Sequence, residues 1–156
     1  MLTIKFQRRK KGKGAAGISS LFPGPNHVKV GFPAGEADAE NIQKAIWNEF
    51  GTSRGIPERP FMRNTMRKKR AEYKAAMKAA AATIIEQAAL GESVAKEKRK
   101  ALKKLGIKAQ GDIQAEITAL RTPPNAPSTI RQKGSSNPLI NSGEMRAAVS
   151  FKVEEK

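Results

Sequence analysis

The sequence predicts a single α+β domain over residues 1–156, in which a small antiparallel sheet packs against a long helix and two further helices. Two observations predict this class. Apolar and polar residues alternate in short segments near both chain ends, as in half-buried strands. Between these segments, apolar residues recur at helical spacing over most of residues 63–120. The N- and C-terminal strands are expected to pair antiparallel, with the helices on one face.

The N-terminal third contains two predicted strands and one helix. Residues 2–6 alternate as a strand, residues 7–14 form a basic arm or loop, and residues 28–32 form a second strand. Asp38 can cap a helix from Ala39 to about Phe50, because its carboxylate can accept from the first-turn N–H groups. The expected apolar face of this helix, with Trp47 as a core anchor, consists of Ile42, Ile46, Trp47 and Phe50.

Two long helices and a final strand complete the prediction. The first helix runs from about Arg63 to Leu90, with an apolar stripe at Met66, Tyr73, Met77, Ala81, Ile84 and Ala88. Ser93 can cap the second, which continues through Gly106 with a possible bend there and buries Leu102, Leu105, Ala109, Ile113, Ile117 and Leu120. Alternation at Ala147, Val149, Phe151 and Val153 predicts the last strand.

The charge balance indicates a polyanionic neighbour. The chain carries 30 Lys and Arg against 14 Asp and Glu, a net charge of +16. Nucleic acid, a phospholipid surface or an acidic protein would each suit this charge, and solubility alone is the plain alternative. The candidate contacts to DNA or to an acidic partner are Arg8, Arg9, Lys10, Lys11, Lys68, Lys69, Lys98, Arg99 and Lys100.

The residue types argue against catalysis. His27 is the single histidine, and there are no cysteines, which excludes disulfides and thiol chemistry. No nucleophile–base pair, cleft carboxylate pair or phosphate-binding glycine motif is apparent. We therefore expect no catalytic residues, cofactor or metal. No apolar stretch approaches the roughly 20 residues that a membrane-spanning helix needs, so no membrane partner is expected.

Two segments are more specific than the composition. Residues 48–63 read NEFGTSRGIPERPFMR, and residues 123–149 contain PPNAPSTIRQKGSSNPLINSGEMR. The pairing resembles the tail-completion, or head–tail connector (neck), proteins of long-tailed bacteriophages and prophages. The two segments cover about a third of the chain. The positions that match the family pattern are Ile56, Pro57, Arg59, Pro60, Phe61, Arg63, Pro127, Ser128, Thr129, Ile130, Lys133, Gly134, Ser135, Pro138, Leu139, Ile140, Gly143, Met145 and Arg146. Asn141 departs from a common Asp, although Asn can also cap a helix.

This resemblance implies a non-enzymatic virion subunit. It would form a ring, expected to be a hexamer, that joins the capsid connector to the tail tube at the neck after assembly in the host cytoplasm. Its implied partners are its own copies, a head connector or adaptor protein, a tail terminator or tail tube protein, and genomic DNA without sequence specificity. The alternatives are a tail terminator or head-completion protein, or a basic non-specific nucleic-acid-binding protein.

The two segments also have a physical interpretation. Pro57 and Pro60 fix an extended approach to the long helix, and Phe61 is placed to fill the core. Arg59 and Arg63 can reach carboxylates or carbonyls of a neighbouring subunit, or can brace the protein's own loop. Residues 121–143 are expected to be a long ordered loop. The full set of interface or loop-bracing candidates is Pro57, Arg59, Pro60, Phe61, Arg63, Pro127, Ser128, Thr129, Ile130, Lys133, Gly134, Pro138, Leu139, Gly143, Met145 and Arg146.

Within the loop, Ser128–Ile130 should open a helical turn, and Gly134 can take a positive φ. Residues 138–140 should bury a small apolar knob. Asn141 or Ser142 could cap a turn that carries Met145 and Arg146.

Overall fold

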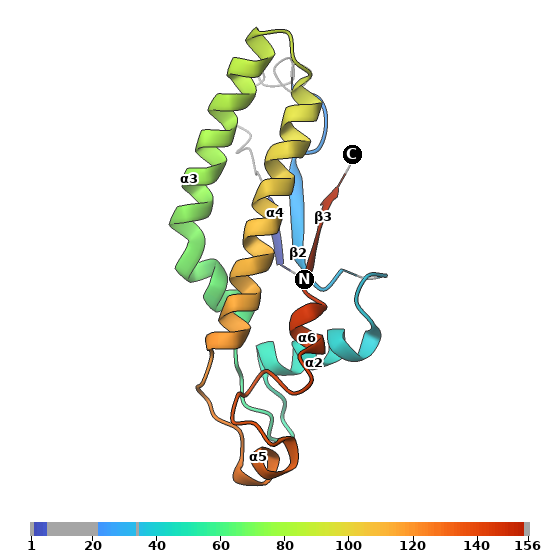
Figure 1. Ribbon diagram of the computed structural model, residues 1–156, viewed down its shortest axis with the longest axis vertical. Helices are drawn as coiled ribbons and strands as arrows, with labels where there is room; N and C mark the ends of the chain where they lie inside the picture. The colour runs from blue at the N-terminus through green and yellow to red at the C-terminus, as the bar shows by residue number, and fades with distance from the viewer. Residues whose placement is uncertain (1, 6–21, 34, 155–156) are drawn as a thin grey trace.

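A computed structural model describes residues 2–5, 22–33 and 35–154. The molecule is elongated, with a helical hairpin at one end and a cluster of short helices and loops at the other (Figure 1). The predicted arm at 7–14, with candidate contacts Arg8, Arg9, Lys10 and Lys11, lies outside the described residues.

The three strands form one antiparallel sheet. Strand β2 (His27–Gly31) lies in the middle, between β1 (Leu2–Lys5) and β3 (Ser150–Glu154). Val28 of β2 is opposite Val153, and Val30 is opposite Phe151. The predicted α+β class, with terminal strands in one antiparallel sheet, is confirmed. The last strand begins at Ser150 rather than near Ala147, because residues 144–147 form a helical turn.

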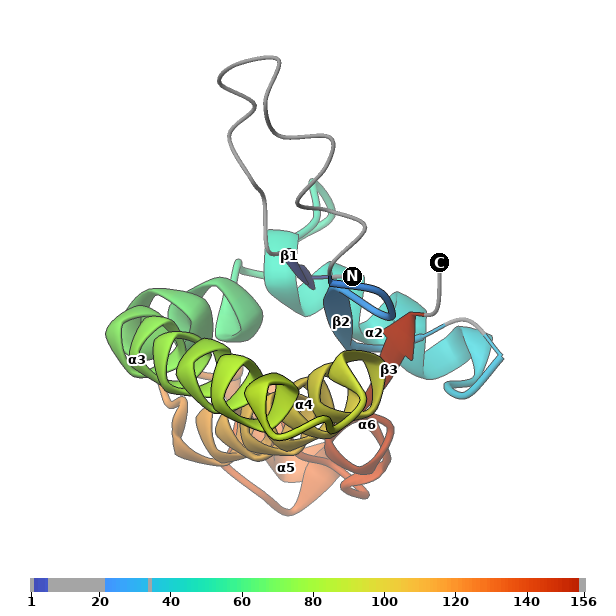
Figure 2. The same ribbon diagram turned by 90° about the horizontal axis from the view of Figure 1, so that it is seen from above.

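The two long helices lie on one face of this sheet (Figure 2). Helix α4 (Val94–Ala119) lies directly against β2 and β3, and helix α3 (Phe61–Ala89) runs alongside α4 (Figure 2). Every predicted core position of α4 is buried: Leu102, Leu105, Ala109, Ile113, Ile117 and Leu120. Together with Val28 and Val30 of β2, they form the centre of the hydrophobic core.

Gly106 allows the close approach of α4 to the sheet. Helix α4 is continuous through this position, and Gly106 is buried against β3. A Cβ atom added at Gly106 would lie 2.3 Å from Cδ2 of Phe151. The glycine within the helical pattern thus provides space for an aromatic ring.

Replacing Gly106 with alanine should therefore destabilise the fold by about 1–3 kcal/mol, because the added methyl group overpacks the contact with Phe151. Gly111 is the matched control, since it is exposed in the same helix and a Cβ there would meet nothing within 4 Å. Gly111→Ala should stabilise by about 0.5–1 kcal/mol, because alanine loses less backbone entropy in a helix. Urea unfolding of both variants measures the difference, and equal effects would contradict the packing role.

Helix α2 (Ala39–Phe50) begins and ends as predicted. The carboxylate of Asp38 accepts a 2.7 Å hydrogen bond from the N–H of Asn41, which lowers the pKa of Asp38. Gly51 follows the helix with φ 70°.

The predicted buried face of α2 is wrong. The helix buries Asn41, Ala45 and Glu49, whereas Ile46, Trp47 and Phe50 are 51%, 40% and 64% exposed. Ile42 is only partly buried. Trp47 is therefore not a core anchor. The helix turns its other side inward because Glu49 is held there by hydrogen bonds to the start of α3.

The predicted stripe of α3 is only half correct. Phe61, Met62, Thr65 and Tyr73 are buried near the start of the helix, and Met66 and Met77 pack on the core. In the second half, Ala81 is exposed and Ile84 and Ala88 are partly buried. This half runs beside α4 alone, so no sheet covers it (Figure 1).

In the described part of the chain, no helix combines the length and apolarity needed to cross a membrane.

Candidate functional site

The structure brings the two distinctive segments together at one end of the molecule. The first segment, residues 48–63, spans the end of α2, a loop and the start of α3. The second contains α5 (Pro127–Lys133) and α6 (Glu144–Ala147). All of these elements gather at the end opposite the α3–α4 turn (Figure 1). We call this region the motif end.

Arg59 joins the two segments directly. Its side chain is only 4% exposed. Its Nε donates to the carbonyl of Pro123 at 2.8 Å, and its Nη2 donates to the carbonyl of Pro124 at 3.0 Å. Nη2 also reaches Oδ1 of Asn125 at 3.2 Å, and Nη1 donates to Oδ1 of Asn48 at 3.2 Å. Arg59 therefore braces the protein's own loop, across 64 residues of sequence to Pro123.

The charge of Arg59 is held by neutral oxygens. Burial lowers the pKa of its guanidinium, which stays protonated because the ordinary value for arginine lies above about 12. No carboxylate among the described residues forms an ion pair with it. A rigid fork of N–H donors suits several carbonyls of a folded loop better than a lysine would.

Glu49 and Arg63 form a second brace, at the start of α3. Oε2 of Glu49 accepts from the N–H of Met62 at 2.9 Å, and Oε1 accepts from the N–H of Arg63 at 3.0 Å. The Nε of Arg63 also donates to Glu49, at 3.0 Å. Nη2 of Arg63 donates to the carbonyl of Glu49 and, at 2.6 Å, to Glu58. These carboxylates, Glu49 foremost, raise the pKa of Arg63.

The carboxylate of Glu49 caps the N-terminus of α3. Pro60 stands at the N-cap of α3 and makes no side-chain capping hydrogen bond, and the first turn of α3 has no acidic residue. Glu49 supplies both the acceptor and the negative charge that a helix N-terminus favours. The end of α2 is thereby fixed to the start of α3.

Phe61 fills the core as predicted. Its side chain has no exposed surface, and its ring meets Phe32 edge-on with centroids 6.3 Å apart. Pro60 is partly buried just before it, whereas Pro57 is exposed in the preceding loop. The segment thus delivers an aromatic side chain inward, while Pro57 remains at the surface.

The loop at 121–143 is ordered by its own contacts. It contains α5, which starts at Pro127 and ends at Lys133. Gly134 follows the helix in the left-handed conformation with φ 68°, as predicted. Ser128, Thr129 and Ile130 lie in its first turns, with Ser128 exposed and the other two partly buried. The Nζ of Lys133 donates to the carbonyl of Asn137 at 2.9 Å. Burial, and secondarily Arg59, lowers the pKa of Lys133.

The segment after α5 forms the predicted apolar knob. Pro138 and Leu139 are buried, and Ile140 packs on the core. Gly143, with φ 91°, occupies the N-cap of α6, and Oγ of Ser142 accepts a long 3.4 Å hydrogen bond from the N–H of Glu144. Within α6, Met145 is buried and Arg146 is exposed. Of the two predicted capping residues, only Ser142 makes such a contact among the described residues.

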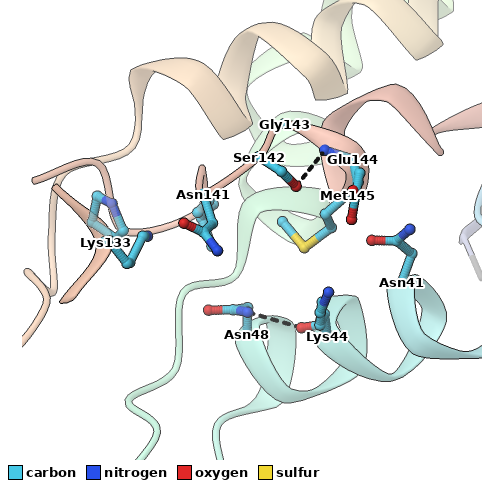
Figure 3. Close-up of a pocket in the computed structure, with 11 residues that line it drawn as sticks. Asn41, Lys44, Asn48, Lys133, Asn141, Ser142, Gly143, Glu144 and Met145 are labelled. Atoms are coloured by element: carbon cyan, nitrogen blue, oxygen red, sulfur yellow. Dashed lines mark hydrogen bonds between the residues drawn. The ribbon is translucent and has the colours of Figure 1, made fainter. Parts of the chain in front are cut away.

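A small pocket with mixed polar and apolar lining lies between α2 and this segment. It has a volume of about 170 Å³ and is lined on one side by Asn41, Lys44 and Asn48 of α2. Figure 3 shows Met145 and Asn141 opposite these side chains. Oδ1 of Asn41 is buried here without a hydrogen-bond partner in the described structure. The volume is below the roughly 300–1,000 Å³ of small-molecule sites, and a bound water would satisfy Asn41.

The described basic candidates do not form one surface. Lys68 pairs with Glu116 at 2.7 Å, and Lys69 pairs with Glu72 at 2.7 Å. Lys98 donates to the carbonyls of Phe22 and Gly24, while Lys100 pairs with Glu97 at 3.7 Å. Arg99 is exposed next to them on α4. Lys98 lies 18 residues before Glu116, which is roughly 27 Å along α4, so the two groups are separate.

Sequence reasoning missed Glu49, Asn48 and Asn137. All three are polar residues whose partners are main-chain or guanidinium groups. Asn137 accepts from the N–H of Leu139 and donates to the carbonyl of Thr118 at 3.1 Å. Glu49 and Asn48 both belong to the first distinctive segment, and their place in that segment was the signal that could have identified them.

The single histidine of the chain lies beside a carboxylate and an amide. Nε2 of His27 lies 2.5 Å from Oε2 of Glu154, and its Nδ1 lies 2.7 Å from Oδ1 of Asn26, at one end of the sheet. No group of three His, Cys, Asp or Glu residues in the described ranges could hold a metal ion.

Comparisons with protein-family models, curated proteins and solved structures found no match to this chain.

Proposed function

We propose that this chain is a non-enzymatic structural subunit of a phage or prophage virion, which assembles as a ring at the neck and joins the capsid connector to the tail tube. One observation supports it most: the two segments that carry the family resemblance fold into one unit, held by Arg59. The presence of both segments in one chain is explained if together they build one surface.

The architecture suits a mechanical role. The motif end is fixed by buried charged hydrogen bonds at Arg59 and Glu49, which hold a loop that would otherwise be costly to order. A loop held rigidly before assembly loses little further entropy on binding. Such a surface can join a connector, a tail terminator or a tube protein.

The charge is compatible with a channel that passes DNA. Arg67, Lys74 and Lys78 are exposed along α3, and they have no ion pair among the described residues. Phosphate contacts by such residues position DNA without reading its sequence.

Electron microscopy of purified virions tests the proposal. We expect density for this chain in a ring at the junction between connector and tail tube, with the motif end at a contact between proteins. Density at the end of the tail tube or within the head would instead indicate a terminator or head-completion role. Absence from virions, together with salt-sensitive binding of the purified chain to random duplex DNA, would favour the basic nucleic-acid-binding alternative.

A further inference from the structure

Two apolar surfaces are exposed in the described part of the chain. The first, which we call the α2 face, consists of Ile46, Trp47 and Phe50. The second, which we call the α3–α4 groove, lies between the second half of α3, the first half of α4 and the segment before β2, and has a volume of about 690 Å³. Exposed apolar surfaces of this kind mark contact sites between proteins.

The groove arises where α3 runs beyond the sheet. Met77, Leu102 and Leu105 lie on its apolar lining, and the short side chains of Ala79–Ala81 leave it open. Phe22 and Ile85 line it and remain 39% and 58% exposed. Its shape and chemistry suit bulky apolar side chains. Among exposed residues of the described structure, Trp47 and Phe50 are side chains of that type.

The α2 face cannot fill the groove of its own chain. Helix α2 is tied to the start of α3 through Glu49, which binds the N–H groups of Met62 and Arg63. Ala81, in the groove, lies 20 residues beyond Phe61, which is roughly 30 Å along the helix. Any contact between the two surfaces therefore joins two molecules.

The charges around the two surfaces are complementary. Glu36, Asp38 and Glu40 are exposed carboxylates around the start of α2, with Lys44 of the same helix as their basic neighbour, within a chain of net charge +16. The groove is lined by Lys98, Lys100, Lys104 and Lys108, with Glu97 as its single acidic residue. Opposite potentials steer two surfaces together and set their orientation.

We propose that the α2 face of one copy docks in the α3–α4 groove of a second copy. This inference deepens, and rests on, the self-association in the proposed function. Each copy uses one surface and leaves its other surface available, so the contact is head-to-tail. Such contacts produce a closed ring when the rotation between copies closes, and a filament when it does not.

Cysteine crosslinking tests the contact, because the chain contains no cysteine of its own. One variant carries Gln43→Cys on the exposed side of α2, and the other carries Ala79→Cys at the groove. When the two are mixed and oxidised, the mixed disulfide should form at least about tenfold faster than with the control Ala115→Cys, at an exposed position of α4 outside the groove, in place of Ala79→Cys. The reason is that docking raises the effective thiol concentration.

A second pair of variants isolates the apolar contact. Trp47→Ala in the Gln43→Cys chain should reduce crosslinking to the control rate, since buried aromatic anchors dominate interface energy. Ile107→Ala is the matched control, because Ile107 is 54% exposed on α4 and does not line the groove. It should leave the rate unchanged.

Two results would overturn the docking. One is a mixed disulfide that forms no faster than with Ala115→Cys, and the other is Gln43→Cys alone crosslinking to itself as fast as to the groove. Virion microscopy separates this failure from that of the proposed function. A ring at the neck without the crosslink overturns the docking alone, whereas the crosslink in a chain absent from virions overturns only the neck assignment.

Discussion

Replacing Phe61 with alanine is expected to lower the free energy of unfolding by about 3–5 kcal/mol, the cost of truncating a fully buried aromatic side chain. Phe61 has no exposed surface and meets Phe32 edge-on. Both the lost burial and the cavity contribute, because Phe61 begins a helix whose position Glu49 fixes, which limits collapse around the gap. Urea unfolding monitored by the fluorescence of Trp47 measures the change.

Phe50→Ala is the matched control for this prediction. Phe50 is 64% exposed, and the guanidinium carbon of Arg63 lies 5.1 Å from its ring centroid. Losing that contact should cost only about 0.5–1 kcal/mol. Similar losses for the two phenylalanines would show that Phe61 does not anchor the core.

Replacing Arg59 with alanine should destabilise the protein by about 2–4 kcal/mol, because it removes a buried cation and leaves the carbonyls of Pro123 and Pro124 without their donors. The loss of ordered structure should be greatest in the loop at 121–143. Trypsin should then cleave after Arg131 and Lys133 much faster than in the original protein, which mass spectrometry would locate.

Two further variants make the Arg59 result specific. Gln132→Ala, in exposed α5, keeps the same trypsin sites and should leave both stability and cleavage unchanged. Arg59→Lys keeps the charge but loses the fork of donors, so it should fall between alanine and the original residue. A stable, protease-resistant Arg59→Ala protein would show that the loop does not depend on this brace.

Sequence periodicity predicted the elements that pack by apolar burial alone. Helix α4 buries every predicted position because one regular face meets the sheet. Asp38 begins α2 through a local capping rule, which needs only nearby residues. The strands followed from alternation, apart from the start of β3, where α6 takes Ala147.

Periodicity failed where a polar residue determined which face was buried. For α2 it selected Ile46 and Trp47, but the buried face follows Glu49, whose partners are N–H groups of the next helix. No pattern of side-chain polarity encodes main-chain donors 13 and 14 residues away. Loop bracing by Arg59 and contact of Arg59 with a neighbouring subunit were equally compatible with the sequence. The partners that Arg59 binds include main-chain carbonyls of a proline-rich loop, which carry no charge that would indicate them.

The α3–α4 pair and the motif end differ in how they respond to ionic strength. The pairs Lys68–Glu116 and Lys108–Glu72 bridge α3 and α4 through partly exposed side chains, and salt screens such charges within a Debye length of about 8 Å under physiological conditions. Arg59 is buried among neutral oxygens, where salt has little access. We therefore expect concentrated salt to weaken these bridging ion pairs while it leaves the hydrogen bonds of Arg59 largely intact.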